Sequence, residues 1–150
     1  MLELNLPRFE VKTKKTDRVY IWDIIRRKYV ALTPEEWVRQ HFINYLVTEK
    51  GYPQSLIANE IQILLNSQKR RCDSVVYDKS LSPLLIVEYK APDVKITQDV
   101  FDQIVRYNMV LKVKYLIVSN GLEHYCCKLN YDTLDFTYLP EIPDYKKLTE

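Results

Sequence analysis

The sequence predicts an α/β domain, bordering on α+β, in which a mixed central sheet is flanked by helices. Three features indicate this fold: a capped helix that begins at residues 33–36, an apolar strand at 84–87, and a second helix leading from that strand to the apolar strand 114–118. A strand, a helix and a further strand of one sheet form a right-handed parallel crossover. Hairpins elsewhere in the chain supply antiparallel neighbours, so the sheet is expected to be mixed.

The composition is that of a single soluble domain. The chain has 150 residues, of which 47% are hydrophobic and 28% charged, so residues 1–150 fit one compact unit and leave no room for a motor. Its two glycines, Gly51 and Gly121, are isolated from each other. Gly-rich phosphate-binding loops of the P-loop and dinucleotide-binding kinds are therefore excluded.

The charges are unevenly distributed although the net charge is only +2. The first 30 residues contain eight Lys or Arg against four acidic residues, and a second basic cluster lies at 69–71. The segment 132–144 is acidic. Such an asymmetry permits a polyanion to bind on one face, and a solvated charged surface explains it equally well.

The cysteines and the N-terminus indicate a cytoplasmic protein. Cys72, Cys126 and Cys127 are odd in number and have neither a disulfide pattern nor the spacing of a zinc site. The N-terminus has no apolar signal segment, and the longest apolar run, 84–87, is too short to span a bilayer. We therefore expect no membrane association.

The first third of the chain contains the clearest local signal. Residues 1–18 are polar and basic and are predicted to form an irregular arm, while 29–32 suggest a short extended piece. The segment 33–36 then supplies an N-cap threonine, a proline at the first helical position and a capping-box glutamate, Glu36. Apolar residues follow at helical spacing, and Gly-Tyr-Pro at 51–53 ends the helix.

The rest of the chain is predicted to contain short strands and one further helix. The polar turn 66–69 joins two strands into a hairpin. The run 84–87 is apolar at every position, as in a central strand covered on both faces. Val100, Ile104 and Tyr107 mark the apolar side of the second helix. The predicted strands are 57–65, 72–76, 84–87, 114–118, 122–128 and 133–139.

Two carboxylates fall where neighbouring strands meet. Asp73 lies near the start of one strand and Glu88 at the end of the next, so antiparallel pairing would place them side by side, with Lys90 on the same face as Glu88. Two carboxylates on rigid strands suit Mg²⁺, with Mn²⁺ as a substitute, and the Tyr89 carbonyl could add a ligand. Such an ion activates a bound water that Lys90 would orient or deprotonate, which predicts metal-assisted phosphodiester hydrolysis.

These residues also carry a resemblance to a known family. Arg71-Cys72-Asp73 and the segment 86–92 (Ile-Val-Glu-Tyr-Lys-Ala-Pro) resemble the signature of the PD-(D/E)xK nuclease superfamily, with Cys72 in place of the proline. More narrowly, residues 30–128 resemble the N-terminal nuclease domain of type I restriction enzyme motor subunits. Three further segments are similar and occur in the family's order: 34–39, Gln103-x-x-x-Tyr107 and Ser119-Asn120-Gly121.

The resemblance implies a restriction-endonuclease-like fold and a hydrolase, namely a Mg²⁺-dependent DNA endonuclease of restriction-modification or DNA repair. It implies that Asp73 and Glu88 ligate the metal and that Lys90 serves the water. Gln103 and Tyr107 would support the site or the DNA backbone as further catalytic residues. DNA is the implied substrate, and separate motor or specificity subunits are the implied partners.

Several alternatives remain open from the residues alone. Glu36 is offered to the metal by the resemblance, and a helix cap explains it equally. A mutual hydrogen bond or core packing would explain Gln103 and Tyr107, and Arg70 and Arg71 either contact phosphate or are turn charges. The alternative function is a nucleic-acid or protein binding module that keeps the nuclease fold without turnover. A third reading is a generic α/β domain with no polyanion ligand.

Overall fold

Nine strands and three α-helices make up residues 2–150 in the computed structural model, which describes this part of the chain. The strands are β1 Thr13–Lys15, β2 Val19–Asp23, β3 Lys28–Ala31, β4 Ile57–Leu65, β5 Gln68–Tyr77, β6 Pro83–Tyr89, β7 Tyr115–Ser119, β8 His124–Asn130 and β9 Asp135–Leu139. The helices are α1 Pro34–Glu49, α2 Gln98–Met109 and α3 Tyr145–Leu148, with a 3₁₀ turn at Gln54–Leu56.

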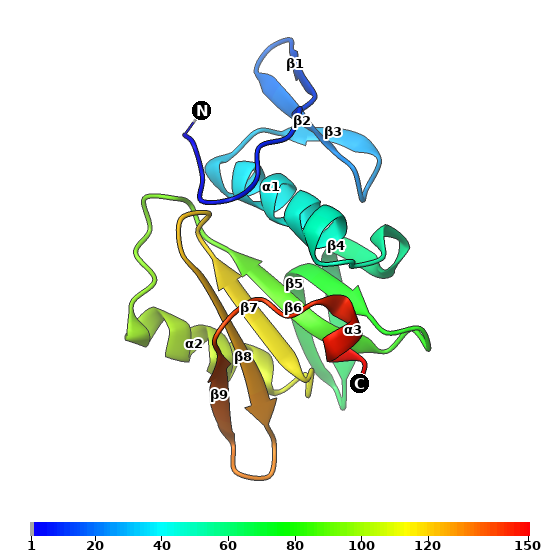
Figure 1. Cartoon of the computed structure of the whole chain (residues 1–150), viewed down its shortest axis with the longest axis vertical. Coiled ribbons are helices and arrows are strands. Elements are labelled where there is room, and N and C mark those ends of the chain that lie inside the picture. The colour runs from blue at the N-terminus through cyan, green and yellow to red at the C-terminus, as the bar shows by residue number, and fades with distance from the viewer. Residues whose placement is uncertain (1) are drawn as a thin grey trace.

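Six of the strands form one mixed sheet, the large sheet, in the order β4-β5-β6-β7-β8-β9 (Figure 1). All neighbouring strands are antiparallel except β6 and β7, which are parallel and are joined through α2. The predicted mixed sheet with one parallel crossover is thereby confirmed. The strands β1, β2 and β3 form a separate antiparallel sheet, the small sheet.

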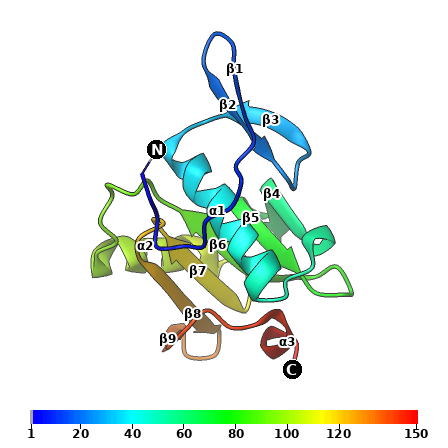
Figure 2. The same cartoon turned by 45° about the horizontal axis from the view of Figure 1, so that its top comes forward.

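Helices cover both faces of the large sheet, and each face has its own hydrophobic core (Figures 1 and 2). Consecutive residues of the central strands enter opposite cores: Ile117 packs with α1 and Leu116 with α2. Cys126 and Cys127 are divided in the same way, which explains why two adjacent buried cysteines form no disulfide. Burying one such side chain contributes about 1.5–3 kcal/mol, so both faces stabilise the fold.

Local sequence signals fix the ends of the main elements. The Thr33 Oγ accepts a hydrogen bond from the Glu36 backbone N–H at 3.0 Å, and Pro34 occupies the first turn of α1. Asn66 and Ser67 have φ angles of 49° and 68°, the left-handed conformation that a two-residue β-hairpin requires. The predicted first helix and the hairpin after it are confirmed in type. The second strand of the hairpin begins at Gln68, four residues earlier than predicted, so Asp73 lies in mid-strand and not near the start.

The N-terminal residues depart from the prediction. Residues 13–15 form β1, so the expected irregular arm includes a strand, and β2 and α3 were not predicted. These strands are three to five residues long, and their outward positions carry lysine and tyrosine. Alternation of apolar and polar residues is the main signal of a strand, and a run of three to five residues is too short to show it clearly.

No helix within residues 2–150 is long and apolar enough to cross a membrane.

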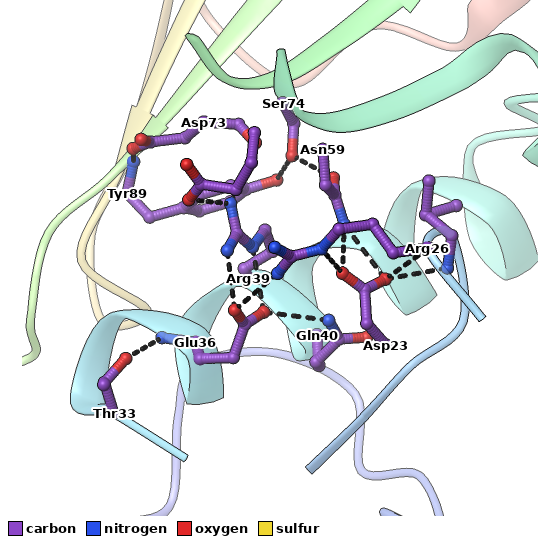
Figure 3. A network of polar contacts seen from close by, with 12 residues as sticks. Asp23, Arg26, Thr33, Glu36, Arg39, Gln40, Asn59, Asp73, Ser74 and Tyr89 are labelled. Carbon is purple, nitrogen blue, oxygen red and sulfur yellow. Dashed lines mark hydrogen bonds and ion pairs between the residues drawn. The ribbon is translucent and has the colours of Figure 1, made fainter. Parts of the chain in front are cut away.

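A buried carboxylate joins the small sheet to the rest of the molecule (Figure 3). Asp23, at the end of β2, is 0% exposed. Its oxygens accept hydrogen bonds from the Arg26 side chain, the Asn59 amide of β4 at 3.0 and 3.1 Å, and the backbone N–H of Ile25. Burial raises the pKa of Asp23, but the bonds from Arg26 and Asn59 outweigh it, so the net pKa is lowered.

We expect Asp23→Ala to destabilise the protein by about 3 kcal/mol, because it leaves Arg26 and the Asn59 amide without their buried acceptor. The pKa of Asp23 is lowered in the folded state. Its contribution to the free energy of unfolding is therefore present at pH values above the ordinary carboxyl pKa, and it is lost as the pH falls through the lowered pKa. Urea unfolding at neutral and acidic pH measures both effects. The exposed Asp132→Ala should change stability by less than about 0.5 kcal/mol, and equal losses in the two variants would contradict the role of Asp23.

Candidate metal centre

Asp73 and Glu88 occupy facing positions of β5 and β6. The paired residues Ser74 and Val87 are the last of the ladder, so Asp73 and Glu88 are the next residues on their strands and lie opposite each other. The Asp73 carboxylate accepts the backbone N–H of Tyr89 at 2.9 Å. Both carboxylates line an open pocket of about 560 Å³, together with Tyr89 and Lys90.

The two carboxylates are held in an environment that disfavours their charge. Burial raises the pKa of Asp73, and the negative charge of Glu60 adds to this effect. Burial also raises the pKa of Glu88, and the neighbouring charge of Asp73 raises it further. Lys90 acts in the opposite direction on both groups without cancelling the shift. A cation between the carboxylates would offset this repulsion.

A buried guanidinium positions the strand that carries Asp73 (Figure 3). Arg39 of α1 is 6% exposed. Its Nη1 donates to the main-chain carbonyl of Asp73 and to the Glu60 carboxylate, both at 2.9 Å. Burial lowers the pKa of Arg39, but hydrogen bonds and charge from Glu36 outweigh this and raise it, so the guanidinium stays charged.

Glu36 belongs to the same network. One of its oxygens accepts hydrogen bonds from Arg26 and Arg39 at 2.9 and 2.6 Å. The other accepts from Arg39 and Gln40, both at 2.9 Å. Thr33 caps the Glu36 backbone N–H as predicted. The prediction that the Glu36 carboxylate accepts the Thr33 backbone N–H in return is wrong, because its oxygens bind Arg26, Arg39 and Gln40. Glu36 lines the pocket beside Asp73 with both oxygens already bonded.

Gln103 and Tyr107 lie on the α2 side of Glu88. Together with Glu88 and Arg71 they line a smaller hollow next to the main pocket. Tyr107 is 45% exposed, so simple core packing does not explain it. The Arg70 guanidinium lies 4.8 Å from the centre of the Tyr107 ring, a cation–π contact. Within residues 2–150 no hydrogen bond joins Gln103 to Tyr107, and the structure thus leaves both side chains accessible beside Glu88.

Three residues near the carboxylates were missed by the sequence analysis. Arg39 had a signal in its spacing, three positions after Glu36 on one helix face. Glu60 binds Arg39 and Arg71 and has a φ of 54°, a left-handed conformation in mid-strand that no sequence pattern indicates. Asn108 is 1% exposed and its amide nitrogen lies 3.4 Å from a Glu88 oxygen.

The donor set suits a hard cation bound by few protein ligands. No three His, Cys, Asp or Glu side chains within the described part of the chain form a metal-binding group. Asp73 and Glu88 are the two carboxylates that the facing strands bring to the pocket. Mg²⁺ commonly takes one or two carboxylates and completes its octahedron with water and substrate phosphate. Burial, with the charges of Glu88 and Asp73, raises the pKa of the Cys72 thiol to about 12. The thiol is therefore protonated at neutral pH in the metal-free protein.

A family model shows the family of this chain, and a solved structure shares its fold. Residues 34–143 match the model of the family described as "Type I restriction enzyme R protein N terminus". The fold is also similar to a fragment of a protein described as an HsdR subunit of a type I restriction enzyme from Vibrio vulnificus YJ016, with a TM-score of 0.51 and 18% sequence identity. The similarity covers 79% of this chain and 25% of that chain. No curated protein matches the sequence.

In the absence of divalent metal, Glu88→Gln should stabilise the protein at neutral pH. The folded-state pKa values of Asp73 and Glu88 are raised. Their ionisation therefore lowers the stability of the folded protein as the pH rises through these pKa values. Below the ordinary carboxyl pKa of about 4 both groups are protonated and no stability is lost. We expect Tm to rise by several degrees at pH 7–8, since about 1 kcal/mol shifts Tm by roughly 2–8 °C, with no gain near pH 4. The exposed Glu141→Gln is the control, and a lower Tm for Glu88→Gln at pH 8 would contradict the repulsion.

Calorimetric titration with Mn²⁺ separates the metal ligands from Glu36. Asp73→Asn and Glu88→Gln should each weaken Mn²⁺ binding at least tenfold, about 1.4 kcal/mol. Glu36→Gln should keep the wild-type affinity but lose about 3 kcal/mol of stability, because Arg39 and Arg26 lose a charged partner. If folded Glu36→Gln no longer bound Mn²⁺, Glu36 would itself be a ligand.

Proposed function

Because the chain belongs to the family of type I restriction enzyme R protein N-terminal regions, we propose that it is a divalent-metal-dependent DNA endonuclease domain of a restriction system. The observation that carries the proposal is the opposed pair Asp73 and Glu88 on the wall of an open pocket, with Lys90 beside them. Their raised pKa values favour the binding of a cation, and the pocket leaves room for a phosphodiester.

In this proposal the chain's own residues orient the reactants. A bound Mg²⁺ would supply the charge that lowers the pKa of a water and stabilises the phosphate. Asp73 and Glu88 hold the cation on two rigid strands, while Arg39 fixes the β5 backbone at Asp73 and so sets the direction of its carboxylate. Lys90 lines the same pocket, and its ammonium would orient the attacking water or the scissile phosphate.

The neighbouring hollow supports a role for α2 in the same reaction. Gln103 and Tyr107 share it with Glu88, so a DNA strand leaving the pocket on this side would meet an amide and a phenol. Both groups donate hydrogen bonds to phosphate oxygens in protein–DNA complexes. The chain spans a quarter of the structurally similar HsdR fragment. Because the family is that of a subunit of type I restriction enzymes, separate motor and specificity subunits are proposed as partners of this domain.

One observation favours the alternative, a binding module with the nuclease fold but no turnover. Glu36, one of five acidic residues that line the pocket, has both oxygens bonded to Arg26, Arg39 and Gln40. A nuclease that needed the Glu36 carboxylate as a further metal ligand would be inactive with this arrangement. The two functions differ in whether Mg²⁺ converts bound DNA into product.

Incubation of the purified chain with supercoiled plasmid and Mg²⁺ tests the proposal. The wild type should nick or linearise the plasmid, while Glu88→Gln and Lys90→Ala should each be slower by at least about 10²-fold, the usual contribution of a positioned acid or base. Glu141→Gln, an exposed carboxylate outside the pocket, should cut at the wild-type rate.

Absence of cleavage by the wild type, or equal cleavage by Glu88→Gln, would contradict the nuclease proposal. Salt-dependent DNA binding without cleavage would then favour the binding module. Chelation with EDTA should stop the reaction, and restoration by Mn²⁺ would support the hard-cation site.

A further inference from the structure

The small sheet has an outward face built from alternating lysine and aromatic residues. Lys14 pairs with Tyr20 and Trp22 with Tyr29, and the Trp22 backbone N–H donates to the Lys12 carbonyl at 2.8 Å. Residues opposite each other on paired strands share a face, so these five form one surface, the lysine–aromatic face. The alternate residues Ile21 and Asp23 are 0% exposed and point inward.

The rings hold the ammonium groups in place. The Lys12 Nζ lies 4.7 Å from the centre of the Trp22 ring and 5.7 Å from that of Tyr29, and the Lys14 Nζ lies 5.1 Å from the Tyr29 ring. None of the ion pairs within residues 2–150 includes Lys12 or Lys14. Cation–π contacts orient a lysine without neutralising it. Both charges therefore remain available to an external anion.

The exposed charge around this face is predominantly positive. Six basic side chains between positions 12 and 31 are exposed: Lys12, Lys14, Lys15, Arg18, Arg27 and Lys28. The one exposed acid in this range, Asp17, accepts hydrogen bonds from the Thr16 and Tyr20 hydroxyls. The other acid, Asp23, is buried against Arg26. Six exposed bases against one exposed acid leave this segment with a net positive charge, which is complementary to a polyanion.

The small sheet also adjoins the candidate metal centre. Val30 and Ala31, at the end of β3, and Arg26, in the turn between β2 and β3, line the same pocket as Asp73 and Glu88. Figures 1 and 2 show the small sheet at one end of the molecule, beside α1 and away from α3. A duplex whose phosphate lay at the carboxylates would continue past this sheet. The sheet precedes residue 34, where the family match begins.

We propose that the lysine–aromatic face binds the DNA phosphate backbone beside the cleavage site, with Lys12 and Lys14 contacting successive phosphates. The inference rests on the proposed nuclease function for its choice of DNA as the polyanion. Each phosphate contact releases counterions, so it contributes about 0.9 to the slope of log K against log salt concentration.

Fluorescence anisotropy with a labelled 30-bp duplex, in EDTA and over a series of salt concentrations, tests the inference on the full chain. The double variant Lys12→Ala/Lys14→Ala should bind at least tenfold more weakly at low salt, and its salt slope should be smaller by about 2, one per lysine. The matched double variant Lys146→Ala/Lys147→Ala removes the same charge from α3 and should bind like the wild type. Equal losses in the two variants, or no loss in the first, would overturn the inference.

Trp22 provides a second readout at the face itself. The chain has two tryptophans, so Trp37→Phe leaves Trp22 alone, and DNA should change its emission because the phosphates draw the lysines from the ring. No change at saturating DNA would contradict the inference. Displacement of the duplex by poly-glutamate as readily as by unlabelled duplex would instead indicate an acidic protein partner and overturn it.

The binding and cleavage experiments test the inferred DNA-binding surface and the proposed nuclease function independently. Binding is measured without metal, so a protein that binds DNA through Lys12 and Lys14 but never cleaves it contradicts the proposed function and supports the inferred surface. A protein that cleaves plasmid in Mg²⁺, but whose Lys12→Ala/Lys14→Ala variant binds and cleaves like the wild type, contradicts the inferred surface alone.

Discussion

The buried guanidinium of Arg39 is the contact on which the arrangement of the site depends. It binds Glu36 on its own helix, Glu60 on β4 and the main chain of Asp73 on β5. Through Glu36 and Arg26 the same network reaches Asp23, and so attaches the small sheet to the large one. A buried ion of this kind stabilises a fold only when all its partners are present. The network therefore sets the relative positions of α1, the small sheet and the strand that carries Asp73.

Against this fixed frame, Asp73 and Glu88 form an unfavourable pair. They face each other beyond the last ladder pair of β5 and β6, and burial raises the pKa of both. Like charges in a partly buried pocket cost stability unless a cation joins them. Residues that break local rules in this way tend to mark functional sites. A bound cation would explain why the protein keeps two carboxylates where neutral side chains would be more stable.

Much of this was predictable from the sequence. The cap at Thr33 and the apolar run 84–87 define α1 and the central strand, and their order gives the mixed sheet. The carboxylates could be placed together because strand pairing fixes their register. The network around Arg39 could not be predicted, because its residues come from four segments, namely the β2–β3 turn, α1, β4 and β5, which meet only after folding. The carboxylate of Glu60 likewise accepts hydrogen bonds from two arginines on other elements, one of them on α1.

The most direct test is the position of a metal ion in crystals of the protein soaked with Mn²⁺. The anomalous scattering of manganese identifies the ion independently of the protein model. The account predicts one strong anomalous peak within coordinating distance of both the Asp73 and the Glu88 carboxylates, and no such peak in crystals of Glu88→Gln. A peak elsewhere in the molecule, or wild-type crystals that bind no Mn²⁺ between these two carboxylates, would contradict it.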